Sequence, residues 1–405
     1  MKRKFLHKLL AAGLLAVILF TNTVFAAAEP TLSAPSAILV DAARGQVLFQ
    51  ENASTKLHVS TASKVMTLLL AIEKAKLDAK VTISKESTET EGSLVSLEVG
   101  EKYAVEDLLY AIMLASANDA ANALAESIAG DTAKFVEMMN EKAKTLGLKD
   151  THFTNPTGLF QEGQYTTAYD LANLMKNALA NPIFNTIFST SAKPWVSKTG
   201  SQVLVNQNKL FWSGYQGVDG GKVGYGNNSL ANVITTATRE NQRLICIVLE
   251  TKQDSAFADS TQLLDYGFNN FHRGLLVSKD TLLKKLQSGD YDLSLASMEN
   301  VYYTHPVGDS YIKNIEFNVN KDLKPPITRD LIVGVARYTL NDESTIDVNL
   351  YSTNEIQPPS KLLTIAKSRL LENKDVFYIL ILLCIIEVII IIANISKYIK
   401  KKVYR

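Results

Sequence analysis

The sequence contains few of the residues that usually hold metal ions or covalent cross-links. Its 405 residues include two cysteines and five histidines. Two cysteines are too few for a disulfide framework, and no two histidines have the i, i+4 spacing that places two imidazoles on one helix face. We therefore expect no metal site. Cys246 lies in the apolar run 244–249, and we interpret it as a small buried hydrophobic residue.

The sequence also lacks a large net charge. It has 42 basic and 41 acidic side chains, but four of the basic residues lie among the first eight positions and five among the last nine. Leaving out these nine and Glu387, an acid in the apolar C-terminal run, gives 33 basic and 40 acidic side chains, a net charge of −7. An acidic middle argues against nucleic acid as a partner.

Both ends of the chain carry membrane-directed patterns. Residues 1–28 have a basic start, an apolar stretch and small residues before position 28, which predicts a signal peptide, with an uncleaved anchor as the alternative. Residues 376–396 form an apolar run long enough to span a bilayer, and the basic tail 397–405 follows. Positive residues favour the cytoplasmic side, so we expect the preceding chain outside the cytoplasmic membrane. Glu387 in this span is either a tolerated protonated acid or a contact with a partner helix.

Residues 29–275 alternate strand-like and helical patterns. Two short strand patterns around Gly45 predict a β-hairpin at 37–50. A helix is predicted at 60–76, with one apolar stripe, and an alanine-rich helical region at 105–129. Two further strand patterns surround a polar turn at 230–249. Helices between flanking strands indicate an α+β fold or mixed sandwich.

A change of pattern after about residue 275 predicts a small β-rich domain over 276–360. Alternating apolar residues, such as Ile346, Val348 and Leu350, are typical of strands with one buried face. We expect a juxtamembrane segment at 361–375 to connect this domain to the membrane span.

Three short segments carry the residue types that acyl transfer by a hydroxyl and an amine requires. Thr61-Ala-Ser-Lys64 places a hydroxyl and an amine one helical turn apart, at the start of the predicted helix. Ser116-Ala-Asn118 introduces polar groups into an otherwise apolar helical run, which is costly unless they line a cleft. Lys222-Val-Gly224 follows a glycine-rich stretch and precedes a strand pattern.

In this order the segments resemble the S-x-x-K, S-x-N and K-T-G motifs of the D-alanyl-D-alanine carboxypeptidases, among the low-molecular-weight penicillin-binding proteins. Glu91-Gly-Ser93 with 99–114, and 152–159 with 167–170, also resemble that family, so the similarity covers about residues 31–275. The resemblance implies a penicillin-binding-protein/β-lactamase-like sandwich of helices and antiparallel sheet, followed by the β-rich domain and a C-terminal transmembrane helix.

The resemblance also implies a role for each matching position. Thr61 would be the nucleophile, Lys64 the general base and Ser116 the proton relay. Asn118, Lys222 and Gly224 would bind the substrate, a peptidoglycan stem peptide that ends in D-Ala-D-Ala. The implied reaction needs no cofactor, and β-lactams would be inhibitors.

Two positions depart from the motifs. Thr61 stands where the family has its nucleophilic serine, and a β-branched side chain restricts χ1 in a helix. Val223 stands where the family has a threonine whose hydroxyl helps to bind the substrate carboxylate. A hydrogen bond to a charged group is worth about 1.5–3 kcal/mol, so its loss predicts binding weaker by about one to two orders of magnitude.

Neighbouring residues offer substitutes that the sequence argues against. One step along a helix turns a side chain by about 100°, which disfavours Ser60 and Ser63 as nucleophiles. A literal Lys198-Thr-Gly200 lacks the preceding Asp-Gly and the following strand pattern, and we interpret it as an ordinary turn. Two alternatives to an active carboxypeptidase stay open: a catalytically impaired relative that binds cell-wall peptides, and a β-lactam hydrolase.

Overall fold

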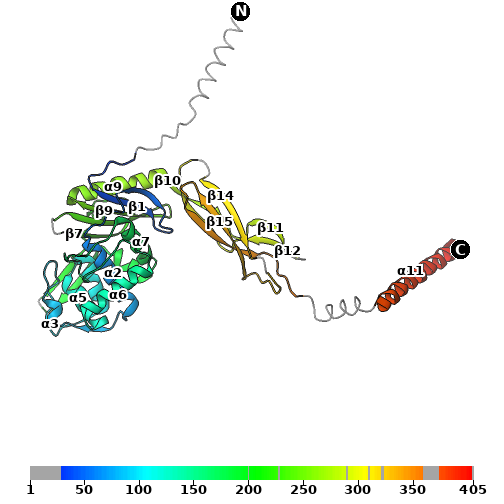
Figure 1. Ribbon diagram of the computed structural model, residues 1–405, viewed down its shortest axis with the longest axis horizontal. Helices are drawn as coiled ribbons and strands as arrows, with labels where there is room; N and C mark the ends of the chain where they lie inside the picture. Colours follow the sequence, from blue (N-terminus) through cyan, green and yellow to red (C-terminus); the bar gives the residue numbers. More distant parts are fainter. Residues whose placement is uncertain are drawn as a thin grey trace, which may run out of the picture. The chain divides into compact units, whose positions relative to one another are not determined.

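The computed structural model describes residues 29–198, 200–226, 229–288, 291–308, 311–320, 323–358 and 374–403. The predicted signal peptide and nearly all of the predicted juxtamembrane segment lie outside these residues. The described contacts divide the chain into two compact units. The first runs to Leu276 and includes Tyr302–Tyr311, and the second comprises Val277–Val301 and the chain from Ile312 onward (Figure 1).

A five-stranded antiparallel sheet forms the centre of the first unit, in the order β2-β1-β9-β8-β7. Its strands are β1 (Ser36–Asp41), β2 (Val47–Glu51), β7 (Val218–Tyr225), β8 (Ala231–Arg239) and β9 (Gln242–Thr251). The two predicted strand pairs are therefore present as hairpins. Glu240 and Asn241 both have positive φ, which the tight two-residue turn between β8 and β9 requires.

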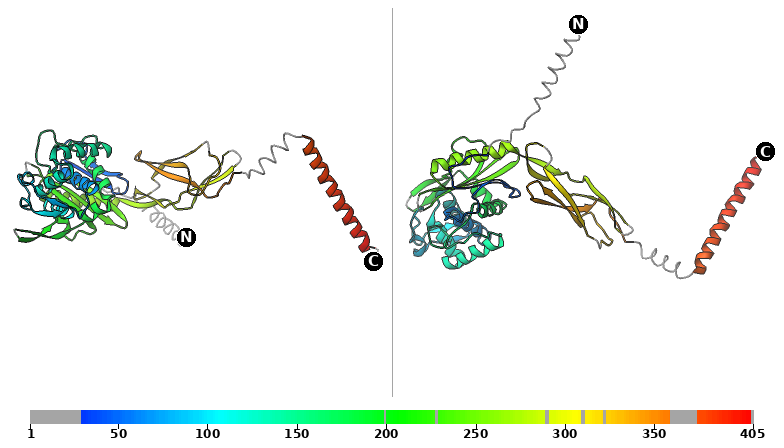
Figure 2. Two further views of the ribbon diagram at one scale, coloured as in Figure 1. Left: turned by 90° about the horizontal axis from the view of Figure 1, so that it is seen from below. Right: turned by 45° about the horizontal axis from the view of Figure 1, so that its top comes forward.

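Both faces of this sheet are buried, because helices cover each side. In β9, Ile245 and Ile247 belong to the apolar cluster on the side of most helices, whereas Leu244 and Cys246 belong to the cluster that includes residues of α9 (Gln253–Asn270). Figures 1 and 2 show α9 on one face and the other helices on the opposite face. Burial on both faces explains why residues 244–249 are apolar without alternation.

The remaining helices and two small hairpins pack on the face away from α9. The helices are α2 (Ser60–Lys74), α3 (Lys85–Thr88), α4 (Val105–Ala115), α5 (Asn118–Ala129), α6 (Thr132–Thr145), α7 (Ala168–Leu179) and α8 (Pro182–Phe188). The hairpins are β3 (Lys80–Thr82) with β4 (Lys102–Ala104), and β5 (Ala192–Ser197) with β6 (Gly200–Val205); the short 3₁₀ helix η1 (Lys209–Phe211) precedes β7.

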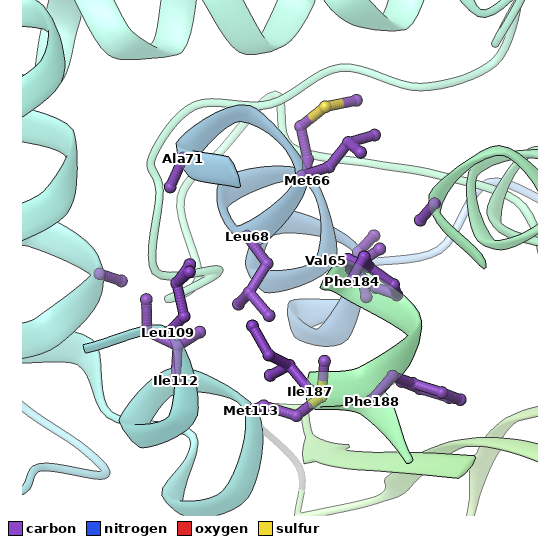
Figure 3. Close-up of a cluster of buried hydrophobic side chains, with 14 of the residues drawn as sticks. Val65, Met66, Leu68, Ala71, Leu109, Ile112, Met113, Phe184, Ile187 and Phe188 are labelled. Atoms are coloured by element: carbon purple, nitrogen blue, oxygen red, sulfur yellow. The ribbon is translucent and has the colours of Figure 1, made fainter. Parts of the chain in front are cut away.

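Helix α2 lies at the centre of these helices. Thirteen of its fifteen residues are buried, so the predicted single apolar stripe was too narrow. Figure 3 shows Val65 and Leu68 in one buried apolar cluster with Ile112 of α4 and Phe184 of α8. A helix enclosed on all sides holds its first turn in a fixed position, and that turn carries Thr61 and Lys64.

The predicted helical region 105–129 is two helices, because the chain turns sharply at Ser116. Ser116 has φ +58° and ψ 28°, in the left-handed region, and ends α4. The backbone N–H of Asn118 then donates to the carbonyl of Ser93, outside the helix. The polar segment 116–118 therefore separates the two helices, and its side chains stay buried.

The second unit contains a five-stranded antiparallel sheet in the order β11-β12-β16-β15-β14. Its strands are β11 (Leu282–Ser288), β12 (Tyr291–Ala296), β14 (Ile312–Val319), β15 (Ile332–Leu340) and β16 (Thr345–Ser352). Ile346, Val348 and Leu350 are buried on one face of β16, as their alternation predicts. Strand β10 (Phe271–Val277) pairs instead with β13 (Val301–Pro306).

The C-terminal helix α11 (Lys374–Val403) contains a segment that is long and apolar enough to cross a membrane. This segment runs from Tyr378 to Lys397, and none of it is buried in the rest of the chain. It overlaps the predicted span 376–396. The fold class expected from the sequence, α+β with a β-rich domain and an apolar C-terminal helix, is confirmed.

Candidate active site

A cavity of about 490 Å³ opens where α2, the α4–α5 junction and β7 meet. Four of the six residues predicted for the site line it: Lys64, Ser116, Asn118 and Gly224. Thr61 and Lys222 do not line it but are buried in its immediate surroundings. Segments from three distant parts of the chain therefore meet in one place.

Lys222 and Ser116 are in direct contact. Lys222 Nζ donates a hydrogen bond to Ser116 Oγ over 2.6 Å, across 106 residues of sequence. The left-handed conformation of Ser116 directs its side chain out of the helix and towards β7. Burial, with a smaller contribution from the positive charge of Lys64, holds the pKa of Lys222 well below its ordinary value.

Lys64 is the second amine of the cavity. Its Nζ donates to the carbonyl oxygen of Thr157, and its side chain is almost fully buried. Burial lowers the pKa of Lys64 to about 7, because a charged ammonium loses its hydration there. A large fraction of Lys64 is therefore neutral near pH 7 and able to accept a proton.

Thr61 is oriented by close packing against β7. A Cβ atom placed on Gly224 would lie 2.7 Å from Thr61 Cγ2, so the methyl group of Thr61 faces the glycine. Thr61 Oγ1 is buried and has no hydrogen-bond partner among the described residues. In this rotamer the methyl group, and not the hydroxyl, lies against the strand that carries Lys222 and Gly224.

Ser60 occupies a place that the sequence argument did not foresee. It lines the cavity together with Lys64, and its Oγ donates to the carbonyl of Tyr225 over 3.3 Å. The argument from a 100° rotation was incomplete, because Ser60 precedes Lys64 by four residues and that spacing also places two residues on one helix face. Ser63, by contrast, donates to Gln164 Oε1 and does not line the cavity.

The side-chain amide of Asn118 uses its nitrogen in a hydrogen bond within the protein and leaves its oxygen without one. Its Nδ2 donates to the carbonyl of Glu91 over 2.6 Å, whereas Oδ1 is buried without a partner among the described residues. A buried acceptor without a partner costs free energy, which a bound ligand with an N–H group would recover. Asn118 is therefore suited to accept a hydrogen bond from a peptide amide.

Val223 lies on the opposite face of β7 from Lys222. It pairs with Val233 in the apolar cluster on the α9 side, whereas Lys222 pairs with Ile234 in the cluster on the α2 side. Val223 is 1% exposed and does not line the cavity. In this structure its side chain is part of the core, so the weaker substrate binding expected from the missing hydroxyl does not follow from its position.

Several other residues of the cavity wall were not singled out for a role from the sequence. They are His58, Glu91, Phe160, Gln207 and Tyr225. The His58 and Phe160 rings are 5.2 Å apart, and burial lowers the pKa of His58. Glu91 belongs to a segment that the family resemblance includes, and Tyr225 ends β7 directly after Gly224, but neither received a role from the sequence. Lys198, from the literal Lys-Thr-Gly sequence, lies at the turn between β5 and β6, away from the cavity lining. The expectation that no strand follows this segment was wrong, because β6 begins at Gly200.

Comparison with known proteins agrees with this geometry. A family model described as D-alanyl-D-alanine carboxypeptidase matches residues 23–253. The chain belongs to this family. A second model, described as the C-terminal domain of penicillin-binding protein 5, matches residues 271–358.

Relatives and solved structures extend the match over most of the chain. D-alanyl-D-alanine carboxypeptidase DacC of Escherichia coli is 33% identical over 358 residues, which cover 83% of this chain and 88% of the relative. DacF of Bacillus subtilis is 36% identical over 261 residues, covering 63% and 67%. The structure of penicillin-binding protein 5 from Haemophilus influenzae superposes with a TM-score of 0.69 at 26% identity, covering 81% of this chain and 99% of that chain. The family predicted from the sequence is thus confirmed.

Proposed function

We propose that this protein removes the terminal D-alanine from peptidoglycan stem peptides through an acyl-enzyme formed on Thr61. Membership of the carboxypeptidase family supports the reaction class. The observation that carries the proposal is the contact between Lys222 Nζ and Ser116 Oγ beside a cavity that Lys64 and Asn118 also line. This arrangement places two amines and a hydroxyl around a free amide acceptor.

The chemistry assigns one step to each group. Neutral Lys64 takes the proton of the Thr61 hydroxyl while Thr61 Oγ1 attacks the carbonyl carbon between the two D-alanines. Backbone N–H groups, including that of Thr61, stabilise the oxyanion. Ser116 gives its hydroxyl proton to the leaving amine and regains a proton from the Lys64 ammonium, so that the C–N bond breaks and free D-alanine departs. A water molecule then attacks the ester, which releases the shortened peptide and restores the hydroxyl.

We expect three other residues around the cavity to contribute to binding of the peptide substrate. The free Oδ1 of Asn118 accepts a hydrogen bond from a substrate amide. Lys222 donates to the terminal carboxylate, whose negative charge favours the ammonium form of this amine when the peptide is bound. Gly224 allows β7 to approach the first turn of α2 closely, which keeps the strand that carries Lys222 beside Thr61 and Lys64. In a β-lactam the reactive carbonyl and the carboxylate are about as far apart as in D-Ala-D-Ala. We therefore expect penicillin to bind to the same groups and to acylate Thr61.

One observation favours a second candidate function, a receptor for cell-wall peptides with little or no turnover. Thr61 Oγ1 has no described partner, and the residue does not line the cavity. If Thr61 keeps this rotamer when a peptide is bound, the cavity binds peptide but forms no ester.

Labelling with penicillin separates the two candidates. Full-length protein in detergent is incubated with a fluorescent penicillin, and peptide mapping by mass spectrometry locates the adduct; release of D-alanine from a D-Ala-D-Ala peptide is measured in parallel. An adduct on Thr61 together with D-alanine release supports the enzyme. No adduct on the native chain, under conditions that label the Thr61→Ser variant, would establish the receptor.

We also propose that α11 anchors the protein to the cytoplasmic membrane with residues 29–275, the carboxypeptidase-like domain, on the outer side. The β-rich domain, 276–360, lies between that domain and α11 in the sequence. Basic residues 397–402 near the end of α11 favour a cytoplasmic C-terminus. Protease added to intact spheroplasts should degrade the large domain and leave a small C-terminal fragment; protection of the whole chain would contradict this orientation.

A further inference from the structure

Two polar side chains interrupt the apolar segment of α11. Tyr378–Lys397 is the stretch that is long and apolar enough to cross a membrane. Glu387 is its one acidic residue, and Asn394 is its one amide residue. Glu387 is the tenth of the twenty residues, so in a helix that rises about 1.5 Å per residue it lies near the middle of an apolar layer about 30 Å thick. An acid at this depth is costly unless it is neutral or meets a partner.

Glu387 and Asn394 share one face of α11. Asn394 follows Glu387 by seven residues, and seven steps of about 100° amount to two turns less about 20°. Cys384, three residues before Glu387, lies about 60° from it around the helix axis. The side chains of all three residues are exposed, and no other described part of the chain covers this segment. The acid and the amide therefore form a narrow polar stripe on a helix that is otherwise apolar at these depths.

We infer that α11 pairs with α11 of a second copy of this protein, through the face that carries Glu387 and Asn394. This inference rests on the proposed anchoring of α11 in the membrane. A neutral carboxyl group has one donor and also accepts, so two of them hydrogen-bond to each other. Two asparagine amides do the same, since each has both donors and an acceptor. The polar stripe is therefore complementary to itself.

A second copy is the partner that fits both polar groups. The basic C-terminal tail favours the same orientation for every copy, so two copies lie parallel and each residue meets its counterpart at the same depth. A different membrane protein would need hydrogen-bonding groups on one face at two depths about 10 Å apart. Hydrogen bonds between the polar side chains of membrane helices typically strengthen association by about 3- to 30-fold.

The thiol of Cys384 reports on this face directly. Full-length protein is reconstituted in vesicles of phosphatidylcholine and phosphatidylglycerol and oxidised with copper phenanthroline; Cys246 is fully buried and should not react. We expect a dimer linked through Cys384. The matched control is the double variant Cys384→Ala with Ile385→Cys, whose thiol lies about 160° from Glu387 around the helix. This variant should give much less dimer at the same protein density, and equal yields would contradict the assigned face.

Substitutions measure the contribution of each polar group. Energy transfer between donor- and acceptor-labelled copies, diluted with lipid, gives the dimerisation constant in the same vesicles. Glu387→Leu should weaken dimerisation by about 3- to 30-fold, whereas Glu387→Gln, which keeps a donor and an acceptor, should stay near the native value. Asn394→Leu should also weaken it. Ser396→Leu is the matched control for Asn394→Leu, because Ser396 is polar but lies about 180° from Glu387 around the helix; it should leave the constant unchanged.

The pairing of α11, its anchoring in the membrane and the proposed reaction are tested separately. Alkaline carbonate extraction tests the insertion of α11, and release of D-alanine tests the reaction. If the protein resists carbonate but shows no energy transfer, or the same dimerisation constant as Glu387→Leu, the pairing alone is overturned. Cross-linking of Cys384 to a different protein in cell membranes, with no dimer in the vesicles, would also overturn it. Extraction of the protein by carbonate would overturn the anchoring and the pairing together.

Discussion

Replacing Thr61 with serine should raise the rate of acylation while lowering stability. The Thr61 methyl group faces Gly224, at a separation so small that an added Cβ would lie 2.7 Å away. Turning the Thr61 hydroxyl towards the substrate requires the methyl group to enter other buried space. Overpacking of this kind costs about 1–3 kcal/mol, which corresponds to roughly a five- to 150-fold slower reaction. Serine has no such methyl group and rotates without this cost.

The same substitution removes a buried methyl group from a packed contact. Its loss should reduce the free energy of unfolding by about 1 kcal/mol. For a domain of this size the melting temperature would then fall by roughly 2–4 °C. Faster acylation together with a lower melting temperature is a combination that a general improvement in folding would not produce.

The assay follows the acylation rate constant with a fluorescent penicillin under single-turnover conditions, with thermal melts on the same preparations. Thr61→Val is the matched control, because valine keeps the branched shape and lacks the hydroxyl; it should not be labelled. Equal rate constants for the native protein and Thr61→Ser would refute the steric argument. Labelling that persists in Thr61→Val would assign the nucleophile to another hydroxyl, with Ser60 the first to examine by mass spectrometry.

Three further predictions concern the walls of the site. Acylation should accelerate between about pH 6 and pH 8, because Lys64, with its pKa lowered to about 7, accepts a proton only when neutral; a flat stopped-flow profile would exclude Lys64 as the base. Gly224→Ala should destabilise the protein by about 1–3 kcal/mol in urea and slow labelling at least about tenfold, through contact with Thr61 and Ser60. Val223→Thr should lower stability by about 1–3 kcal/mol by burying a hydroxyl, and change kcat/KM by less than about threefold. A tenfold gain would show instead that this hydroxyl reaches the substrate.

The sequence located the site because its motifs describe short-range geometry. Thr61 and Lys64 share the first turn of α2, and that relationship depends only on helix periodicity. The strands of both hairpins were also predictable, since apolar runs and polar turns are local signals. The meeting of Lys222 with Ser116 was expected from the order of the motifs, which the family resemblance supplied.

Other features depend on tertiary packing and had no local signal. The burial of α2 results from the helices that surround it, and no pattern within residues 60–74 predicts those neighbours. Helix α4 ends at Ser116, although the alanine-rich sequence around this residue favours a continuous helix. Val223 faces the core because of the register of β7 with β8.

Because of this packing, we expect Thr61 to affect the reaction more than Val223 does. The side chain of Val223 lies on the core side of the sheet. Valine in place of the family's threonine therefore exchanges one buried side chain for another. At Thr61 the added methyl group lies between the helix and β7, where Gly224 already has no room for a Cβ atom. Close approach of α2 and β7 is what brings Lys64, Ser116 and Lys222 around one cavity. The contact that assembles the site therefore also restricts the rotation of Thr61, the nucleophile that we propose, and we expect its methyl group to set the balance between peptide binding and acyl transfer.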